Sequence, residues 1–271
     1  MATIDIIILA KNEARNLPDC LASFKGLGQA VVIDDNSSDG TARLAREAGA
    51  LVFERAMDSF SGQRNYALTV SNAEWVFFLD ADERFSPGLV EAVRERVGGP
   101  KVAGKARRRN FAFGRRFRFG HLAPDWVTRL FPRGEVTWSG EVHESPETGL
   151  EAVALPGFLE HHTYRGWDQF LSKMERYARL WAKGAAIKGK RSSVIGALAK
   201  ASFTILKNLV LKLGFLDGPY GWAVCVVSGY YTLSKYLFLN SLDCEGRELS
   251  GEGRDLATED SDSVISGPGK R

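Results

Sequence analysis

The chain is poor in cysteine, with only Cys20, Cys225 and Cys244 among its 271 residues. Their spacing fits neither a disulfide framework nor a thiolate metal site, so the sequence indicates a reducing compartment. An excess of charge of one sign is also lacking, because 36 Lys and Arg nearly balance 33 Asp and Glu. Domains that bind nucleic acid usually have a strong basic excess, and we therefore expect no nucleic-acid partner.

Two loops that bind phosphate groups are absent as well. No Gly-x-Gly-x-x-Gly follows the first predicted strand, which argues against a dinucleotide-binding oxidoreductase. No Gly-x-x-x-x-Gly-Lys-Ser/Thr occurs either, which argues against a P-loop NTPase. The apolar run over residues 4–10 is too short for a secretory signal and has no basic start, so we predict a strand there.

The first hundred residues alternate between strand-like and helical patterns. Apolar runs predict strands over residues 4–9, 30–34, 51–54 and 75–79, and amphipathic spacing predicts helices over residues 17–24, 42–48 and 63–70. Regular alternation of this kind is typical of an α/β fold with a mostly parallel sheet and right-handed crossovers. Ligands of such sheets bind beyond the carboxyl ends of the strands.

Polar clusters follow three of the predicted strands: Lys11-Asn12-Glu13, Asp34-Asp35-Asn36-Ser37 and Asp80-Ala81-Asp82. Asp80 and Asp82 are two residues apart at a strand end, so their carboxylates point to the same side. Such a pair suits Mg²⁺ or Mn²⁺, which share their oxygen ligands with substrate phosphates. The alternative is an ordinary turn, since Asp is common where strands end. The convergence of three clusters favours a nucleotide site.

Residues 105–120 are rich in arginine and phenylalanine. The alternation of their phenylalanines predicts a strand or hairpin with one aromatic face. The arginines suit a phosphorylated or carboxylated substrate, and the alternative is a solvated basic strand. His161 and His162 are expected to be structural, because adjacent strand residues point to opposite faces while a metal site needs converging ligands.

The chain from Trp167 has apolar residues at helical spacing, with many Lys and Arg among them. Basic, aromatic-rich amphipathic helices are typical of proteins that lie in the membrane interface, and the alternative is helices that pack on one another or on the sheet. The apolar run over residues 222–233 is shorter than the roughly 20 residues of a spanning helix. Residues 245–271 contain almost no large apolar side chains, so we expect a disordered tail.

Together these motifs resemble glycosyltransferase family 2, whose members have the GT-A fold. The resemblance rests on four segments in the first third of the chain: residues 6–13, residues 32–41, Gln63-Arg64-Asn65 and residues 78–83. Each segment alone is a weak signal, whereas their order and spacing are specific. Arg129-Leu130-Phe131, Val142-His143-Glu144 and the basic apolar C-terminal part resemble more narrowly the branch that builds the lipopolysaccharide inner core, which includes β-1,4-glucosyltransferases.

The resemblance implies a GT-A domain over residues 1–163, divided into a nucleotide-sugar-binding half (1–100) and an acceptor half (101–163). A membrane-associating helical region (164–244) and the tail (245–271) would follow. By the same resemblance, Ala10, Asn12 and Glu13 line the nucleotide pocket, and Asp35 accepts a hydrogen bond from the base. Arg64 lies near the nucleotide, Asp80 lies beside the ribose and the metal, and Asp82 is the direct metal ligand.

The activity implied is inverting transfer of a sugar, glucose in the narrower branch, from a nucleotide-diphosphate sugar such as a UDP-sugar. The acceptor would be a lipid-linked saccharide of the inner core, held in part by arginines at positions 107–109, 115, 116 and 118. We expect Glu144 to be the general base, with Glu141 and Asp125 as alternatives, because the family's usual Glu-Asp motif is missing. The implied location is cytoplasmic and peripheral, on the inner face of the cytoplasmic membrane.

Three other functions stay open at this point. A polyisoprenyl-phosphate glycosyltransferase of the same family also meets its acceptor at a bilayer. A sugar-phosphate nucleotidyltransferase can share the fold, but it needs a Gly-rich triphosphate loop, and Lys11-Asn12-Glu13-Ala14-Arg15 is not one. A catalytically silent, membrane-bound saccharide-binding scaffold is disfavoured by the intact carboxylate set.

Overall fold

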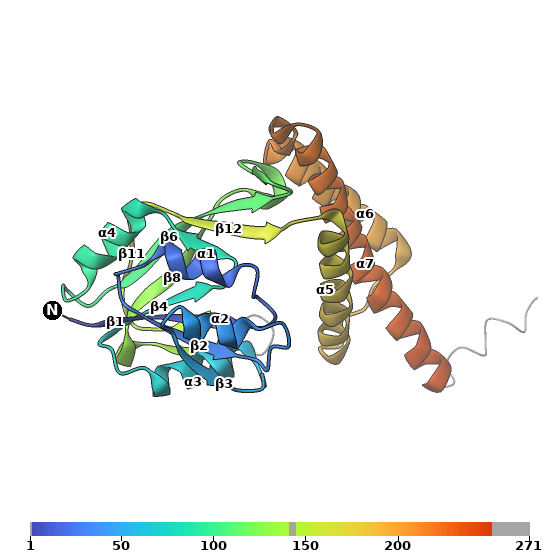
Figure 1. Ribbon diagram of the computed structural model, residues 1–271. Coiled ribbons are helices and arrows are strands. Elements are labelled where there is room, and N and C mark those ends of the chain that lie inside the picture. Colours follow the sequence, from blue (N-terminus) through green and yellow to red (C-terminus); the bar gives the residue numbers. More distant parts are fainter. Residues whose placement is uncertain (1, 141–144, 251–271) are drawn as a thin grey trace, which may run out of the picture. The chain divides into compact units, whose positions relative to one another are not determined.

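The computed structural model describes residues 2–140 and 145–250, with side chains up to residue 243. The chain forms two compact units (Figure 1). The first, the sheet unit, comprises the residues up to Arg118 together with Leu122–Gly166. The second, the helical unit, comprises Phe119–His121 and the chain from Trp167 onward.

The first half of the sheet unit is parallel, with strands in the order β3-β2-β1-β4. These strands read as nearly continuous apolar runs because helices cover both of their faces. Their bounds are β1 Ile4–Ala10, β2 Gln29–Asp34, β3 Leu51–Glu54 and β4 Trp75–Asp80. Helices α1 Leu17–Ser23, α2 Thr41–Glu47 and α4 Pro87–Arg96 pack on one face, and α3 Phe60–Val70 packs on the other.

The second half continues from β4 in the order β8-β6-β12-β5. Here β8 is antiparallel to both β4 and β6, β12 is parallel to β6, and β5 is antiparallel to β12. The bounds are β5 Glu83–Phe85, β6 Ala103–Ala112, β8 Asp125–Pro132 and β12 Leu159–Tyr164. Short strands are β7 Arg115–Arg116, β9 Thr137–Ser139, β10 Ser145–Glu147 and β11 Ala152–Ala154, and 3-10 turns are Gly120–Leu122 and Arg133–Glu135.

The predicted α/β fold is confirmed, and each of the four strands and three helices expected in the first hundred residues is present within a few residues of its predicted bounds. The hairpin expected in residues 105–120 forms between β6 and β7, but it is shorter than predicted. Phe113 and Gly114 both have φ near +60° and make the turn, so Phe117 lies beyond β7 and is buried instead of lining a common aromatic face.

The helical unit consists of three long helices: α5 Trp167–Ile187, α6 Val194–Leu206 and α7 Gly218–Ser250. A π-helical turn Lys207–Leu211 and a 3-10 turn Gly214–Asp217 connect α6 to α7. Both α5 and α6 pack along α7. The helix α7 continues through residues 245–250, which the sequence analysis assigned to the disordered tail. An established helix extends at little cost, and this explains the longer helix. Residues 251–271 lie outside the described residues.

Gly157 gives a test of the packing between the loop before β12 and helix α4. Its φ is +88°, and an added Cβ would lie 2.3 Å from the backbone nitrogen of Leu89. We expect Gly157→Ala to lower the thermal unfolding midpoint by roughly 5 °C or more, because the strained φ alone costs about 1–2 kcal/mol and the α4 backbone cannot move aside. The matched control is Gly134→Ala, which has open space and an ordinary φ. Equal thermal unfolding midpoints of Gly157→Ala and Gly134→Ala, measured by circular dichroism, would contradict this expectation.

Candidate active site

The carboxyl ends of β1, β2 and β4 meet at one edge of the sheet. In the strand register Ala10 lies beside Asp34, and Leu9 lies beside Asp80. The three polar clusters noted in the sequence therefore follow strands that end side by side, as expected for a ligand site of a parallel sheet.

The loops after β1 and β2 are joined by hydrogen bonds from Asn12 and Glu13. The Asn12 backbone N–H donates to Ser37 Oγ (2.8 Å), and Asn12 Oδ1 accepts from the Ser38 N–H (2.8 Å). The Glu13 N–H donates to Thr41 Oγ1 (2.8 Å). Asn12 has φ +56°, a conformation that Asn tolerates better than most residues. These contacts set the shape of the loops, and the predicted nucleotide contacts of Asn12 and Glu13 stay predictions.

Asp35 is nearly buried and is held from two sides. Its Oδ2 accepts from Lys11 Nζ (2.6 Å), and its Oδ1 accepts from the Met57 backbone N–H (2.9 Å). The Asp35 N–H in turn donates to the Ala10 carbonyl (2.8 Å). The hydrogen bond from Lys11 holds the pKa of Asp35 below its usual value, so the carboxylate is ionised at neutral pH. Each carboxylate oxygen can accept a second hydrogen bond, which leaves capacity for a ligand.

Asp80 lies between two buried arginines. Its Oδ2 accepts from Arg129 Nη2 (2.5 Å), and its Oδ1 faces Arg64 Nη2 at 3.3 Å. Burial alone would raise the pKa of Asp80, but the charges of Arg129 and Arg64 outweigh that effect and hold the pKa well below its usual value. The Arg64 guanidinium also lies 4.5 Å from the ring centroid of Trp138. Asp80 is therefore a fixed anion with both oxygens engaged.

The ionic network continues through the fully buried Glu83. Glu83 Oε1 and Oε2 accept from Arg129 Nη2 (3.0 and 3.2 Å), and Glu83 Oε2 also accepts from the Asp80 backbone N–H (3.1 Å). Arg108 Nη1 lies 3.4 Å from Glu83 Oε1 and joins Asp125 to the network. The Arg108–Asp125 pair is bidentate, with distances of 3.0 and 2.7 Å. The turn after β4 is thus anchored to β6 and β8.

Asp82 faces the imidazole of His161, with 3.4 Å between Asp82 Oδ2 and His161 Nε2. Asn110 orients this imidazole. The Asn110 amide nitrogen donates to two backbone carbonyls, so Asn110 Oδ1 must accept from His161 Nδ1 (2.8 Å). With its proton on Nδ1, a neutral imidazole presents the lone pair of Nε2 to the Asp82 carboxylate. Two electron-rich groups at this distance suit a cation between them.

This pair of donors fits a divalent cation that takes its other ligands from a diphosphate and water. Asp80, the second metal ligand expected from the sequence, has both oxygens on arginines, and its role toward a metal stays a prediction. Among the described residues, no group of three or more His, Cys, Asp and Glu side chains forms a closed metal site. The neighbouring His162 points the other way and stacks on Phe111, with ring centroids 5.1 Å apart.

The expected general base falls in a segment that the structure does not describe. Glu141, His143 and Glu144 lie within residues 141–144, outside the described residues. Asp125, the other alternative, is described, and both of its oxygens accept from Arg108. Both oxygens of Asp125 are thus engaged by Arg108 unless the pair opens.

The arginines of β6 divide between the two faces of the strand. Arg108 points toward Glu83 and Asp125, whereas Arg107 and Arg109 alternate to the opposite face. There the Arg109 guanidinium stacks on Phe158 at 3.4 Å from the ring centroid. Burial, together with the charges of Arg116 and Arg107, lowers the pKa of Arg109. Arg108, expected to hold acceptor phosphates, is instead committed to two carboxylates.

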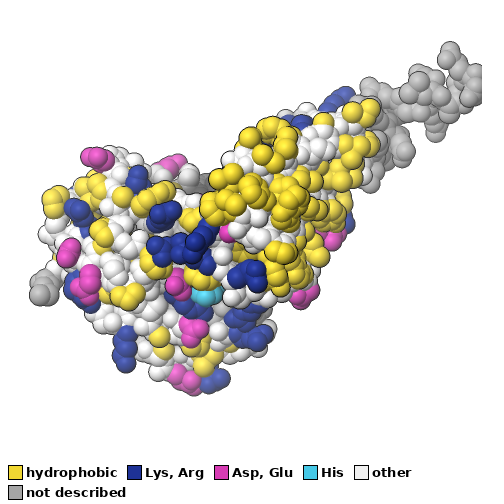
Figure 2. All heavy atoms as spheres, turned by 90° about the horizontal axis from the view of Figure 1, so that it is seen from above, with side chains coloured by type: hydrophobic (Ala, Val, Ile, Leu, Met, Phe, Trp, Pro, Cys, Tyr) yellow, Lys and Arg dark blue, Asp and Glu magenta, His cyan; other side chains and the backbone are white. Residues whose placement is uncertain are grey.

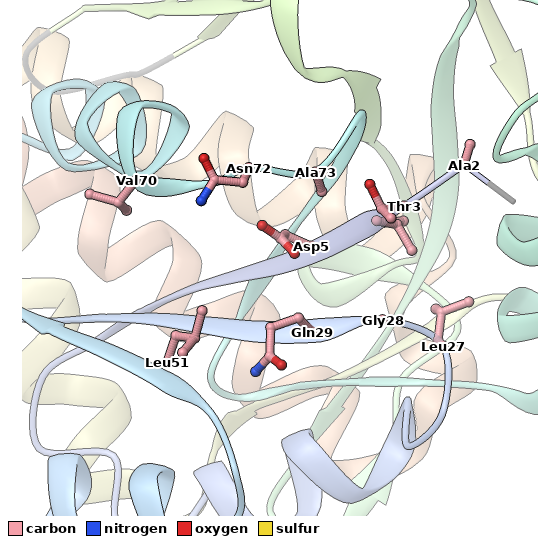
Figure 3. A pocket seen from close by; sticks show the side chains of 11 residues that line it. Ala2, Thr3, Asp5, Leu27, Gly28, Gln29, Leu51, Val70, Asn72 and Ala73 are labelled. Atoms are coloured by element: carbon pink, nitrogen blue, oxygen red, sulfur yellow. The ribbon is translucent and has the colours of Figure 1, made fainter.

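A hollow of about 500 Å³ lies at the other edge of the sheet (Figure 3). It is lined by the residues that begin the first three strands, among them Thr3, Asp5, Gln29 and Leu51. The carboxylate of Asp5 is occupied there by a hydrogen bond from Ser71 Oγ (2.7 Å). Because the candidate site residues gather at the carboxyl ends of the strands, this hollow is separate from the candidate site.

Three residues of the site received no role from the sequence: Glu83, Asn110 and Arg129. His161 was expected to be structural, and its position opposite Asp82 makes it a candidate ligand instead. Glu83 and Arg129 belong to motifs on which the family resemblance rests, and only this membership could have indicated a role for them. Asn110 and His161 come from β6 and β12, which are far from the Asp80–Asp82 motif in sequence and become neighbours only through strand pairing.

Comparisons with known proteins find a matching family model and similar proteins. The model of the family described as "Glycosyl transferase family 2" matches residues 5–146. The lipopolysaccharide core biosynthesis glycosyltransferase LpsC of Rhizobium meliloti is 29% identical over 200 residues, covering 69% of this chain and 73% of that protein.

Two further matches are weaker, one because it covers a smaller part of this chain and one because its sequence identity is lower. A TPR repeat-containing protein of Synechococcus elongatus is 40% identical over 104 residues, 38% of this chain, and the chain spans only 26% of that protein's length. Among solved structures, mannosyl-3-phosphoglycerate synthase from Rubrobacter xylanophilus is similar with a TM-score of 0.42 and 18% identity, covering 71% of this chain and 76% of that chain.

The Asp80–Arg129–Glu83 contact predicts a large effect of one substitution. Arg129→Met should destabilise the protein by about 3–5 kcal/mol, because it leaves the buried Glu83 with only the longer contact to Arg108 (3.4 Å). The exposed pair Arg43–Glu47 provides the control, and Arg43→Met should cost less than about 1 kcal/mol. Urea unfolding of both variants at pH 7 is the measurement.

The pH dependence gives a second measurement on the same variant. An Asp whose pKa is lower in the folded than in the unfolded state stabilises the fold at pH values above its unfolded pKa, which is near 3.9. This contribution to the free energy of unfolding is lost as the pH falls below that value. Arg129→Met removes one of the two charges that lower the pKa of Asp80. The difference in unfolding free energy between wild type and variant should therefore be larger at pH 7 than at pH 3. A difference that does not depend on pH, or a loss no larger than that of Arg43→Met, would contradict the assignment.

Proposed function

The chain belongs to glycosyl transferase family 2, and on this premise we propose that it is an inverting glycosyltransferase of lipopolysaccharide core synthesis. It would transfer glucose from UDP-glucose to a lipid-linked saccharide of the inner core. The similarity to LpsC, whose name places that protein in core biosynthesis, supports the acceptor class. The observation that carries the proposal is the convergence of Asp35, Asp80 and Asp82 at one sheet edge, with His161 facing Asp82.

The donor would bind across the ends of β1, β2 and β4. The ionised Asp35 has free lone pairs for an N–H of the base. Asp80, fixed by Arg64 and Arg129, would accept from the ribose, and the loop of Asn12 and Glu13 would close one side of the pocket. The base pocket is formed by side chains and not by a glycine-rich loop, consistent with the motifs of the sequence.

Asp82 and His161 would hold a divalent cation beside the diphosphate. Such a cation neutralises the negative charge that develops on the departing diphosphate. Asn110 would keep the imidazole in the tautomer that leaves Nε2 free. The chain's own contribution is therefore an orienting one: it fixes a carboxylate and an imidazole 3.4 Å apart before the donor arrives.

The acceptor hydroxyl would lose its proton to Glu144 as its oxygen attacks the anomeric carbon. The bond from that carbon to the diphosphate breaks at the same time, and UDP leaves with inversion of configuration. Glu141 is the next choice. Asp125 is the least favourable of the three, because Arg108 engages both of its oxygens. Arg107, Arg109 and Arg116 would attract the phosphates of an anionic core saccharide.

A lipid-linked acceptor requires an enzyme at a membrane surface, so we propose a peripheral location on the inner face of the cytoplasmic membrane. Within the family, a polyisoprenyl-phosphate acceptor is the main alternative. A silent saccharide-binding scaffold is a second alternative, disfavoured by the ionised and oriented carboxylates of the site.

A donor screen tests the proposal directly. Purified protein would be incubated with labelled UDP-, GDP- and CMP-sugars and either truncated core lipid or polyisoprenyl phosphate, with Mg²⁺ or Mn²⁺. Transfer from UDP-glucose to the core lipid is the expected result. Transfer to polyisoprenyl phosphate instead would identify the alternative acceptor, and no transfer or donor hydrolysis with any donor would favour the scaffold.

Asp82→Ala should lower transfer by about 10³-fold or more, because the cation would lose a ligand and charge on the diphosphate would go unneutralised. The fold should persist, since the Asp82 side chain is partly exposed and is not part of the hydrophobic core. Calorimetry should also show that UDP binding no longer depends on Mn²⁺. The control is Asp19→Ala, an exposed carboxylate paired with Arg84. Turnover at the wild-type rate in Asp82→Ala would exclude the metal role.

Glu144→Gln should lower turnover about 10²–10⁴-fold while leaving the affinity for the donor unchanged, because a general base acts on the acceptor. Glu147→Gln, at an exposed position of β10, is the neighbouring control. If Glu144→Gln retains its turnover, the same measurement on Glu141→Gln and Asp125→Asn identifies the base.

A further inference from the structure

The helix α6 exposes an apolar stripe along its length. Its members are Ile195, Leu198, Phe203 and Leu206, continued by Val210 in the π-helical turn, and between 47% and 81% of each is exposed. Such a row of large apolar side chains is unusual on a surface that faces water. Figure 2 shows hydrophobic side chains gathered over the helical part of the molecule.

The opposite face of α6 is made of small and polar residues and packs closely on α7. Ala197 and Ala201 are buried there, and Asn208 Nδ2 donates to Ser228 Oγ at 2.9 Å. A Cβ on Gly229 would lie 2.3 Å from Ile205 Cγ1, so the helices approach too closely for a larger residue. Small residues inside and large apolar residues outside reverse the usual arrangement of a water-soluble helix pair and match helices in contact with lipid.

Lysines lie beside the stripe. Lys200 and Lys207 are exposed on α6 and its continuation, and Lys200 Nζ lies 3.9 Å from the ring centroid of Tyr236. Over residues 167–243, eleven Lys and Arg face four Asp and Glu. An apolar stripe with flanking lysines and a cationic surround is complementary to a bilayer that carries anionic headgroups.

The stretch Val194–Leu211 has the length and hydropathy to cross a membrane, and among the described helices it alone does. The packing argues against a crossing. Because α7 runs back along α6, a spanning α6 would take α7 across as well, with Lys235 in its middle. Helix α5, also packed on α7, has an exposed charged surface that includes the pair Glu175–Arg179 (2.8 Å). These charges belong in water or among headgroups.

We propose that α6 lies in the plane of an anionic bilayer, with its apolar stripe among the upper acyl chains and Lys200 and Lys207 at the headgroups, and that it does not span the membrane. The proposal deepens the proposed function by naming the surface on which the enzyme meets its acceptor. It rests on contacts within the helical unit and can fail or hold independently of glycosyl transfer.

The test uses the full chain and lipid vesicles. Sedimentation with vesicles of phosphatidylglycerol and phosphatidylcholine should show strong binding, and vesicles of phosphatidylcholine alone should show much weaker binding. Phe203→Glu and Ile195→Glu should each lower the partition coefficient by roughly tenfold or more, because each removes a buried apolar side chain from the lipid. Leu51→Glu, which alters an equally exposed side chain on β3, should bind as wild type.

The role of the lysines has its own pair of variants. The double variant Lys200→Gln/Lys207→Gln should bind both kinds of vesicle equally, and its binding should no longer weaken with added salt. The control is the double variant Lys25→Gln/Lys101→Gln on the sheet unit, which should bind as the wild type does. Circular dichroism of every variant confirms that the helices are retained.

Two results would overturn the proposal: unchanged vesicle binding in the α6 variants, or retention of the wild-type protein in membranes washed with alkaline carbonate, which releases interfacial proteins and leaves spanning ones. Transfer to a detergent-dispersed acceptor is measured in parallel. Normal vesicle binding without any transfer would count against the proposed function alone, and transfer without vesicle binding would count against this proposal alone.

Discussion

The ionic contact of Arg129 with Asp80 and Glu83 holds the candidate site together. Arg129 and Glu83 are buried, Asp80 is partly exposed, and the contact joins the end of β4, the start of β5 and the middle of β8. A buried guanidinium between two carboxylates tolerates little displacement, because each charge depends on the others for its solvation. The turn between β4 and β5 is therefore rigid. Asp82 lies in that turn, and the contacts of Asp80 and Glu83 fix its position.

The two halves of the sheet unit contribute different parts of the site. The parallel half ends in loops cross-linked by hydrogen bonds of Asn12, Glu13 and Asp35. The second half supplies His161, Asn110 and Arg108 from β12 and β6. Because β4 belongs to the first half and β8 pairs with it directly, the strand pair β4–β8 is the junction that brings both sets together.

The parallel half was predictable from the sequence because its signals are local. Apolar runs, turns and the position of Asp80 relative to its strand each depend on a few neighbouring residues. The partners of Asp80 and Asp82 were not predictable in this way. Arg129 and His161 are 49 and 79 positions from those carboxylates, and only the antiparallel and parallel pairings of β8, β6 and β12 bring them near. The sequence also treated Arg107, Arg108 and Arg109 as one group, whereas the alternation of a strand separates them.

The two adjacent histidines of β12 show how much depends on the alignment of this one strand. His161 points inward to Asp82, and His162 points outward to Phe111. A slip of β12 by a single residue would exchange the two faces and bring Glu160 or His162 to the position that His161 now holds opposite Asp82. The pairing of β12 with β6 is regular from Leu159 to His162 and becomes irregular only between His162 and Tyr164. An extra residue is thus accommodated downstream of the histidines, and length changes on that side can be absorbed without altering which side chain meets Asp82.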